Sequence, residues 1–119
     1  MSVEGNGTIV RFTGVNVQIV SGNGATDGPV NALGNLIIGY NEQRDPENER
    51  PPADRTGSHN IVVGAAHGYS SFGGLVSGID NSVSAPYGAV VGGRTNSIGG
   101  VAAAVVGGEC NGAGGEVST

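Results

Sequence analysis

Hydrophobic and polar positions repeat along the second half of this chain in rows of similar length. Each row starts with aliphatic residues, passes through glycine or another small residue, and ends on a polar residue. The four clearest rows start at Ile61, Leu75, Val90 and Val105, which lie 14, 15 and 15 positions apart (75−61, 90−75 and 105−90). A fixed short period of this kind is typical of a protein built from stacked repeats.

The length of the repeat predicts the kind of stack. A unit of 14 or 15 residues has room for two short strands and two bends, but not for a helix and a return segment. One such coil cannot bury its apolar side chains alone, so successive coils must stack about 4.8 Å apart and share backbone hydrogen bonds. We therefore predict an all-β protein, a parallel β-solenoid with coils of 14 to 15 residues.

The row pattern also predicts which side chains face the core. We expect the first aliphatic positions of the rows, with nearby valines, to point into one shared core: Ile61, Leu75, Val90, Val63, Val91 and Val106.

A polar residue recurs at the sixth position after each row start, at His67, Asn81, Asn96 and Asn111. Asparagine at a bend tolerates left-handed backbone angles, and its side chain bonds nearby backbone groups. We interpret these residues as a structural ladder at one corner of the stack. Contacts to a ligand are the alternative.

The chain divides into two parts. Residues 1–34 are predicted to form an entry coil, with strand character over residues 8–20, followed by a loop rich in glycine and asparagine. Residues 35–119 are predicted to form the solenoid, because residues 35–39 match residues 60–64 position for position. The chain stops in the middle of a row, so we expect it to be part of a longer protein.

A charged insertion at residues 42–57 separates the row at residues 35–39 from the row at residues 60–64. Its three prolines prevent strand pairing at their own positions, so we expect it to leave the column as a projecting loop. It either binds a partner, including a neighbouring protomer through an arginine, or is a solvated loop without one. The candidate binding residues are Arg44, Asp45, Glu47, Glu49, Arg50, Asp54 and Arg55.

Composition excludes several classes of function. The 119 residues include 24 glycines, no tryptophan, no lysine and five arginines against ten acidic residues. This charge balance predicts neither nucleic-acid binding nor a polybasic membrane patch, and no segment is long and apolar enough to span a bilayer. Cys110 is the only cysteine, which excludes an intrachain disulfide and a paired-cysteine zinc site.

Catalytic motifs are also missing, so we predict a protein that is not an enzyme and needs no cofactor. No nucleophile elbow occurs, and His59 and His67 are the only plausible bases. Three copies of one histidine around a threefold axis could bind a metal, but we expect both histidines to be structural and predict no metal site.

The three rows at residues 75–81, 90–96 and 105–111, with their small-residue half-coils and corner asparagines, resemble the head domains of trimeric autotransporter adhesins or a related secreted β-solenoid repeat protein. The resemblance implies a left-handed parallel β-roll in a tight homotrimer. It further implies an adhesive module on the bacterial surface or in a secreted assembly, with a host or matrix protein or a glycan as its partner. Thin coils also favour a trimer on physical grounds, because packing columns together buries a second face.

Two other functions remain open. A glycan-binding module would use exposed tyrosines as stacking surfaces, with Tyr40, Tyr69 and Tyr87 as candidates. A trimeric enzyme would place its site between protomers.

Overall fold

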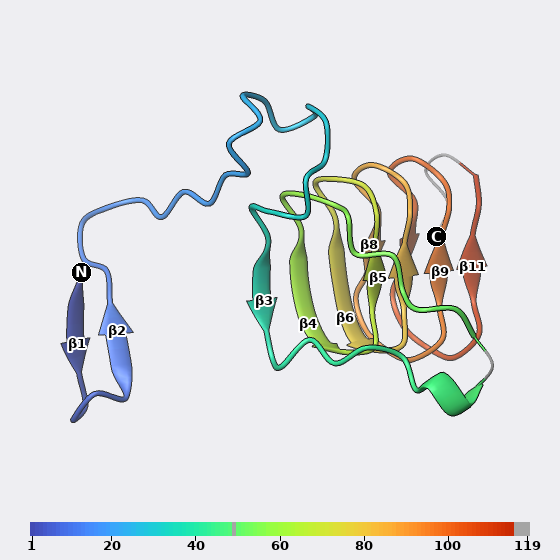
Figure 1. The fold of residues 1–119 in the computed structure, drawn as a ribbon, viewed down its shortest axis with the longest axis horizontal. Coiled ribbons are helices and arrows are strands. Elements are labelled where there is room, and N and C mark those ends of the chain that lie inside the picture. The colour runs from blue at the N-terminus through green and yellow to red at the C-terminus, as the bar shows by residue number, and fades with distance from the viewer. Residues whose placement is uncertain (49, 116–119) are drawn as a thin grey trace.

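A computed structural model, which describes residues 1–48 and 50–115, confirms the all-β parallel solenoid (Figure 1). One sheet has the order β3-β4-β6-β8-β10 and the other has the order β5-β7-β9-β11. The first is formed by β3 (Leu36–Ile38), β4 (Ile61–Ala65), β6 (Leu75–Ile79), β8 (Ala89–Val90) and β10 (Ala104–Val105). The second is formed by β5 (Gly68–Tyr69), β7 (Ser82–Val83), β9 (Ser97–Ile98) and β11 (Gly112–Ala113).

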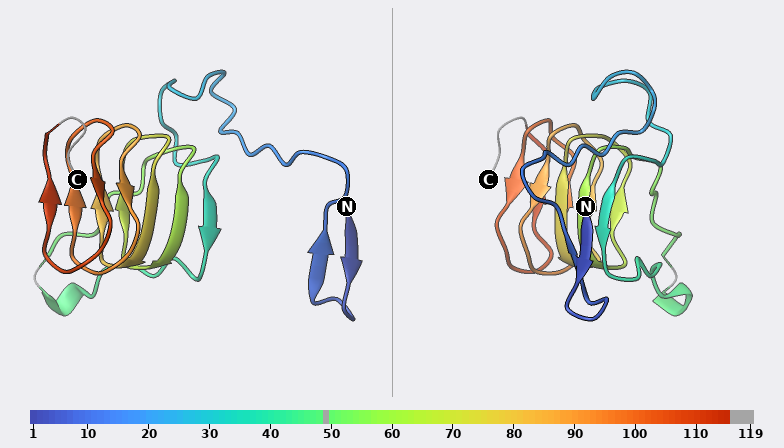
Figure 2. Two further views of the ribbon diagram at one scale, coloured as in Figure 1. Left: turned by 180° about the vertical axis from the view of Figure 1, so that it is seen from behind. Right: turned by 90° about the vertical axis from the view of Figure 1, so that its left-hand side faces the viewer.

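From β4 onward each coil contributes one strand to each sheet, and the two sheets face each other across the core (Figure 2). Neighbouring coils pair in parallel, with Ile61 opposite Leu75 and Val62 opposite Val76. The only helix in the described ranges is the short 3-10 helix η1 (Pro46–Asn48), which lies in the charged insertion.

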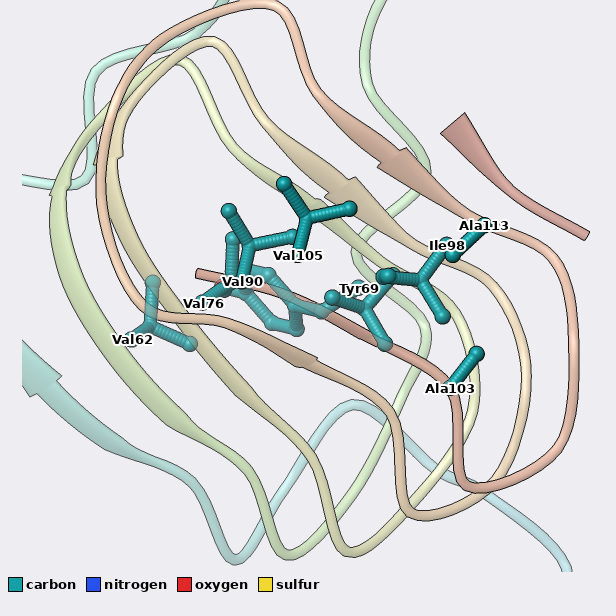
Figure 3. Packing of buried hydrophobic residues seen from close by; sticks show 9 residues of the cluster. Val62, Tyr69, Val76, Val90, Ile98, Ala103, Val105 and Ala113 are labelled. Carbon is teal, nitrogen blue, oxygen red and sulfur yellow. The ribbon is translucent and has the colours of Figure 1, made fainter. Parts of the chain in front are cut away.

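One inward row from each sheet forms the core (Figure 3). Branched side chains stack along the first sheet, and the second sheet supplies the facing row. The first row is Val62, Val76, Val90 and Val105, and the second is Tyr69, Val83, Ile98 and Ala113. The core is therefore one residue wide on each side, which is why a chain with few large side chains can build it.

The expected core assignment was wrong at most positions. Val90 is fully buried, but Ile61, Val91 and Val106 are exposed, and Val62 takes the inward place in its row. The physical reason is that side chains alternate along a strand, and both alternating sets are aliphatic here. The pattern predicted the length of the repeat but not which side of each strand points into the core.

The spacing between rows also differs from the expected one. Leu75 pairs with Ala89 rather than Val90, so these strands repeat after 14 residues (89−75). Ile79 bridges Arg94, so the bend repeats after 15 (94−79). One extra residue is therefore accommodated between Val90 and Arg94.

Glycine is required where one coil passes over the next. Gly64 and Gly78 both have positive φ angles, of 109° and 107°. A Cβ on Gly64 would lie 2.0 Å from the Gly78 carbonyl oxygen, and one on Gly78 would lie 2.2 Å from the Gly93 carbonyl oxygen. No side chain fits at that distance, so this bend stays tight only with glycine.

The N-terminal part of the chain is not the expected entry coil. Strands β1 (Ser2–Glu4) and β2 (Ile9–Arg11) form an antiparallel hairpin separate from both solenoid sheets. Residues 12–20 then run as an extended, exposed segment to the loop at residues 21–34 (Figure 1). The apolar residues that predicted a strand are present, but no coil lies beside them to pair with.

Candidate functional site

The corner residues form a ladder that runs along the stack. The Asn81 side chain donates to the Ser77 carbonyl at 2.9 Å, and its Oδ1 accepts from the Asn96 backbone N–H at 2.8 Å. Asn96 Oδ1 accepts in the same way from the Asn111 N–H at 2.8 Å. Each side chain thus holds the bend of its own coil and the corresponding bend of the next coil. Both its donor and its acceptor are bonded to the backbone, which is a structural role.

His67 takes the place of asparagine in this ladder. Its Nε2 lies 2.9 Å from the Val63 carbonyl oxygen, four residues back, and its Nδ1 lies 3.1 Å from the Asn81 backbone nitrogen. This pattern assigns the neutral tautomer with the proton on Nε2, which donates, while Nδ1 accepts. Burial lowers the pKa of His67 below its ordinary value. The ring is fully buried, so it is neither a base nor a metal ligand open to solvent.

The left-handed residue of the bend is the one that precedes each ladder residue. Ala66, Asp80, Thr95 and Cys110 have φ angles of 61°, 55°, 56° and 58°. We expected the asparagines themselves to be left-handed. They are not, because their side chains must point inward to reach the backbone of two coils. Cys110 accordingly lies at an exposed bend position.

A second, shorter ladder was missed by the sequence analysis. Asn35 Oδ1 accepts from the Asn60 backbone N–H at 3.0 Å, and Asn60 Oδ1 accepts from the Gly74 N–H at 2.9 Å. Both asparagines immediately precede a strand of the first sheet. Their equivalent places in the matched rows at residues 35–39 and 60–64 were the signal that could have identified this ladder.

The charged insertion lies against the solenoid corner instead of projecting from it. Arg44 Nε lies 3.0 Å from Asp80 Oδ1, and Arg50 pairs with Oδ2 of the same carboxylate. Arg44 also donates to the Ser82 hydroxyl. The structure thus brings the two arginines together on Asp80. Sequence analysis did not select Asp80, because it lies 36 and 30 positions away from them (80−44 and 80−50).

Arg55 anchors the C-terminal end of the insertion. Its guanidinium donates to the backbone carbonyl of His67 at 2.8 Å and to the carbonyls of Asn41 and Glu42. Burial lowers the pKa of Arg55 from its ordinary value, which is so high that the group stays charged. The arginine therefore closes the loop between the two ends of the insertion.

Residues 53–58 belong to the solenoid wall rather than to a loop. Ala53 is buried, the Asp54 carbonyl accepts from the Tyr69 N–H at 2.8 Å, and Gly57 N–H donates to the Tyr69 carbonyl at 2.9 Å. The Thr56 hydroxyl and N–H lower the pKa of the Asp54 carboxyl. Residues 53–58 therefore run alongside β5 and are hydrogen-bonded to it at Tyr69.

Among the remaining acidic candidates in the described residues, the contact is a local one between Asp45 and Glu47. Asp45 Oδ1 accepts from the Glu47 backbone N–H at 2.9 Å and thereby caps η1. Glu47 is exposed, and Glu49 lies outside the described residues. The six candidates within the described residues therefore do not come together in one cluster.

A cavity of about 340 Å³ lies between the insertion and the solenoid corner. Its lining includes Arg44, Asp45, Asp80, Arg94 and Thr95. Arg94 pairs with Glu109 at 2.9 Å, so the charged groups around the cavity have partners within the chain. The cavity therefore results from the attachment of the insertion to the solenoid, and its arginines and Asp80 are paired with one another or with Glu109.

We predict that Asp80→Asn loosens the insertion. The change removes a charged acceptor shared by two arginines, and a hydrogen bond to a charged group contributes about 1.5 to 3 kcal/mol. Cleavage by subtilisin within residues 42–52 should become roughly tenfold faster or more. Glu109→Gln breaks an exposed ion pair and is the control, with the parent's cleavage rate. Equal rates in all three proteins would show that Asp80 does not hold the insertion.

His59 holds the N-terminal loop on the first coil. Its Nε2 accepts from the Ser21 backbone N–H at 3.0 Å, and its Nδ1 lies 3.2 Å from the Thr26 carbonyl oxygen. Beside it, the fully buried Ser58 exchanges hydrogen bonds with Asn31. Both histidines thus have both ring nitrogens engaged with backbone atoms.

The three tyrosines are not equivalent. Tyr69 is buried in the core, and its hydroxyl accepts from the Asn41 side chain at 2.9 Å, so it cannot stack on a ligand. Tyr40 is 94% exposed, and Tyr87 is half exposed with its edge against Phe72. The stacking surface expected for a glycan therefore retains two tyrosines.

The outer face of the first sheet is apolar. Side chains that point away from the core on this sheet are aliphatic except at Ser77, and many of them are well exposed. We define the outer face by Leu36, Ile38, Ile61, Val63, Leu75, Val91 and Val106. Val106 alone is 71% exposed. A largely apolar face of this kind, exposed to solvent, is typical of an interaction surface.

Residues 1–48 and 50–115 contain no group of three or more His, Cys, Asp or Glu side chains placed to hold a metal ion. They also contain no helix of the length and hydropathy needed to cross a membrane.

Comparison of the chain with protein-family models, with curated proteins and with solved structures found no match.

Proposed function

We propose that this chain is a non-enzymatic structural module that assembles into a homotrimer and acts as the adhesive head of a bacterial surface or secreted protein. The observation that carries the proposal is the apolar outer face of the first sheet. The sequence resemblance to trimeric autotransporter heads supplies the number of subunits and the location. Host or matrix proteins and glycans are the partners that such a head would bind.

The outer face supports self-association because it continues along the stack. Ile61 and Leu75 lie side by side in adjacent coils, and Leu36 precedes them in the same row. A repeated face of one chain matches the same repeated face of another copy, so a symmetric assembly can bury all coils at once. Burying aliphatic surface contributes about 25 cal/mol per Å².

The polar groups support a structural role. Both histidines, the corner asparagines and the arginines of the insertion bond to backbone atoms or to partners in their own chain. A catalytic residue requires a side chain free to reach a substrate, and these polar groups serve the scaffold instead.

The test is the oligomeric state by analytical ultracentrifugation. We expect a trimer at micromolar concentration, and Ile61→Glu should weaken assembly by about 100-fold or more because it places a charge in an apolar interface. Ser97→Glu adds the same charge on the outer side of the second sheet, where Ser97 is exposed, and should leave the trimer intact. A parent protein that sediments as a monomer would refute the proposal.

A second candidate function is glycan binding, which is favoured by Tyr40. A tyrosine that is 94% exposed next to the outer face presents a full aromatic ring for stacking on a sugar. A glycan array compares the parent with Tyr40→Ala and Tyr87→Ala. Loss of a signal in either variant supports the binding module, and an array without signal from the parent contradicts it.

A further inference from the structure

Within the described residues, the first coil of the solenoid has no strand paired on the outer side of β3, although the loop at residues 21–34 is attached elsewhere on that coil. Strand β3 pairs only with β4, so the backbone groups on its other edge are open. Ile37 pairs with the core residue Val62 and therefore belongs to the inward row, yet it is 41% exposed. Solenoids need a capping element at such an end, because an open edge and an open core row invite contact with another chain.

The N-terminal hairpin is the element that could cap this end, but it does not cap its own column. The hairpin stands apart from β3 in Figure 1 and in the left-hand view of Figure 2. Side chains on both parts confirm the separation, because Val3, Ile9 and Val10 are exposed as well as Ile37. The hairpin and the end of the solenoid are thus two apolar surfaces that remain unburied in a single chain.

The connecting segment at residues 12–20, which we call the strap, is apolar and unattached. Phe12, Val15, Val17, Ile19 and Val20 are all exposed. Within the described residues, no backbone hydrogen bond joins the strap to the rest of the chain. An extended segment of this composition is stable only when another surface covers it.

The excess surface of the chain has the size of an interface. The accessible surface is 7002 Å², whereas a compact monomer of this mass exposes roughly 5900 Å². The difference of about 1100 Å² exceeds the roughly 800 Å² that one partner buries in a stable protein interface. The radius of gyration of 15.2 Å, against about 13.5 Å for a compact domain of this length, points to the same extended part.

We propose that the hairpin and strap of each chain cap the open end of an adjacent copy's solenoid, at β3. The proposal rests on the self-association inferred above, in which the columns lie side by side. Nine strap residues span about 30 Å when extended, and the shortest dimension of the chain is 24 Å. The strap is therefore long enough to reach from one column to the next, where the hairpin covers Ile37 and the open strand edge.

Photo-crosslinking in a mixed assembly tests this directly. Val10 is replaced by benzoylphenylalanine in the full chain, which is then mixed, through unfolding and refolding, with ¹⁵N-labelled parent protein. After irradiation, mass spectrometry should find the Val10 peptide joined to a ¹⁵N peptide that contains residues 36–38. Crosslinks only within one chain, or only to other parts of the partner, would overturn the proposal. The circular dichroism spectrum of the variant must match that of the parent.

Two further variants separate this inference from the proposed trimer. Deletion of residues 1–20 and the substitution Ile37→Glu should each weaken assembly by tenfold or more, because each removes one half of the same contact. If the deletion leaves assembly unchanged and Ile61→Glu abolishes it, the proposed capping of β3 by an adjacent copy is wrong and the outer-face trimer stands. If only the deletion weakens assembly, the outer-face proposal is wrong and the capping proposal stands. A monomeric parent overturns both.

Discussion

Replacing Asn81 with leucine is expected to lower the free energy of unfolding by about 3 to 5 kcal/mol, a large part of the stability of a small domain. Leucine has nearly the same shape but cannot bond the backbone. The Asn96 N–H loses its acceptor, and the carbonyls of Ser77 and Gly93 lose a donor. Asn81 is fully buried, so water cannot replace these bonds.

Urea denaturation followed by circular dichroism measures the change. Asn111→Leu is the matched control, because Asn111 occupies the same ladder position but is exposed, and its side chain bonds only the Gly107 carbonyl within the described residues. The control should lose less than about 1 kcal/mol. If the two variants lose equal amounts, the buried hydrogen bonds of the ladder do not determine its stability.

Acid is expected to destabilise the protein through His67. Burial lowers the pKa of His67 in the folded chain, so the unfolded chain binds its proton more tightly. The stability contributed by the neutral ring is thus fully present above about pH 6.5, the unfolded value. It declines as the pH falls from there through the lower folded pKa, by up to about 1.4 kcal/mol per pH unit. A protonated ring also loses the Nδ1 acceptor that the Asn81 N–H requires.

His67→Asn should remove this pH dependence and keep the fold, because asparagine already fills the equivalent places at Asn81, Asn96 and Asn111. The measurement is the urea midpoint at several values between pH 5 and pH 7.5. The variant retains His59, so any slope that persists in it comes from other groups. A parent and variant with the same slope would contradict the assignment of the pH effect to His67.

The sequence predicted the period and the class of fold because both depend on repetition. Rows with glycine and a corner polar residue at fixed intervals specify a stack of coils whatever the details of packing. The assignment of Asn81 and Asn96 to one ladder needed only that spacing, because residues at equivalent places in a stack lie one above another.

The orientation of the core could not be predicted in the same way. In the row that begins at Ile61, both alternating sets of side chains are aliphatic, so either face could have been inside. The deciding factor is the opposite sheet, where Tyr69 and Val83 belong to the same buried cluster as Val62 and Val76. The extra residue between Val90 and Arg94 was also hidden, because it shifts the strand and the bend by different amounts.

The placement of the charged insertion depended on long-range partners. Its composition predicted a projecting loop, and its prolines do keep it out of the sheets. Asp80, two coils further along, binds Arg44 and Arg50 and draws the insertion onto the corner. No local pattern distinguishes this aspartate from an ordinary bend residue, so the attachment becomes visible only in three dimensions.

The stacking of each coil on its immediate neighbours has a consequence for the order of folding. From β4 onward, paired strands are only 14 or 15 residues apart in a chain of 119, a ratio of about 0.12, which is low for an all-β protein and predicts comparatively fast folding. The pairing of β3 with β4 spans 25 residues (61−36) and encloses the charged insertion. Closing that larger loop costs more chain entropy, so the coils from β4 to β11 can form first and the first coil adds to them last.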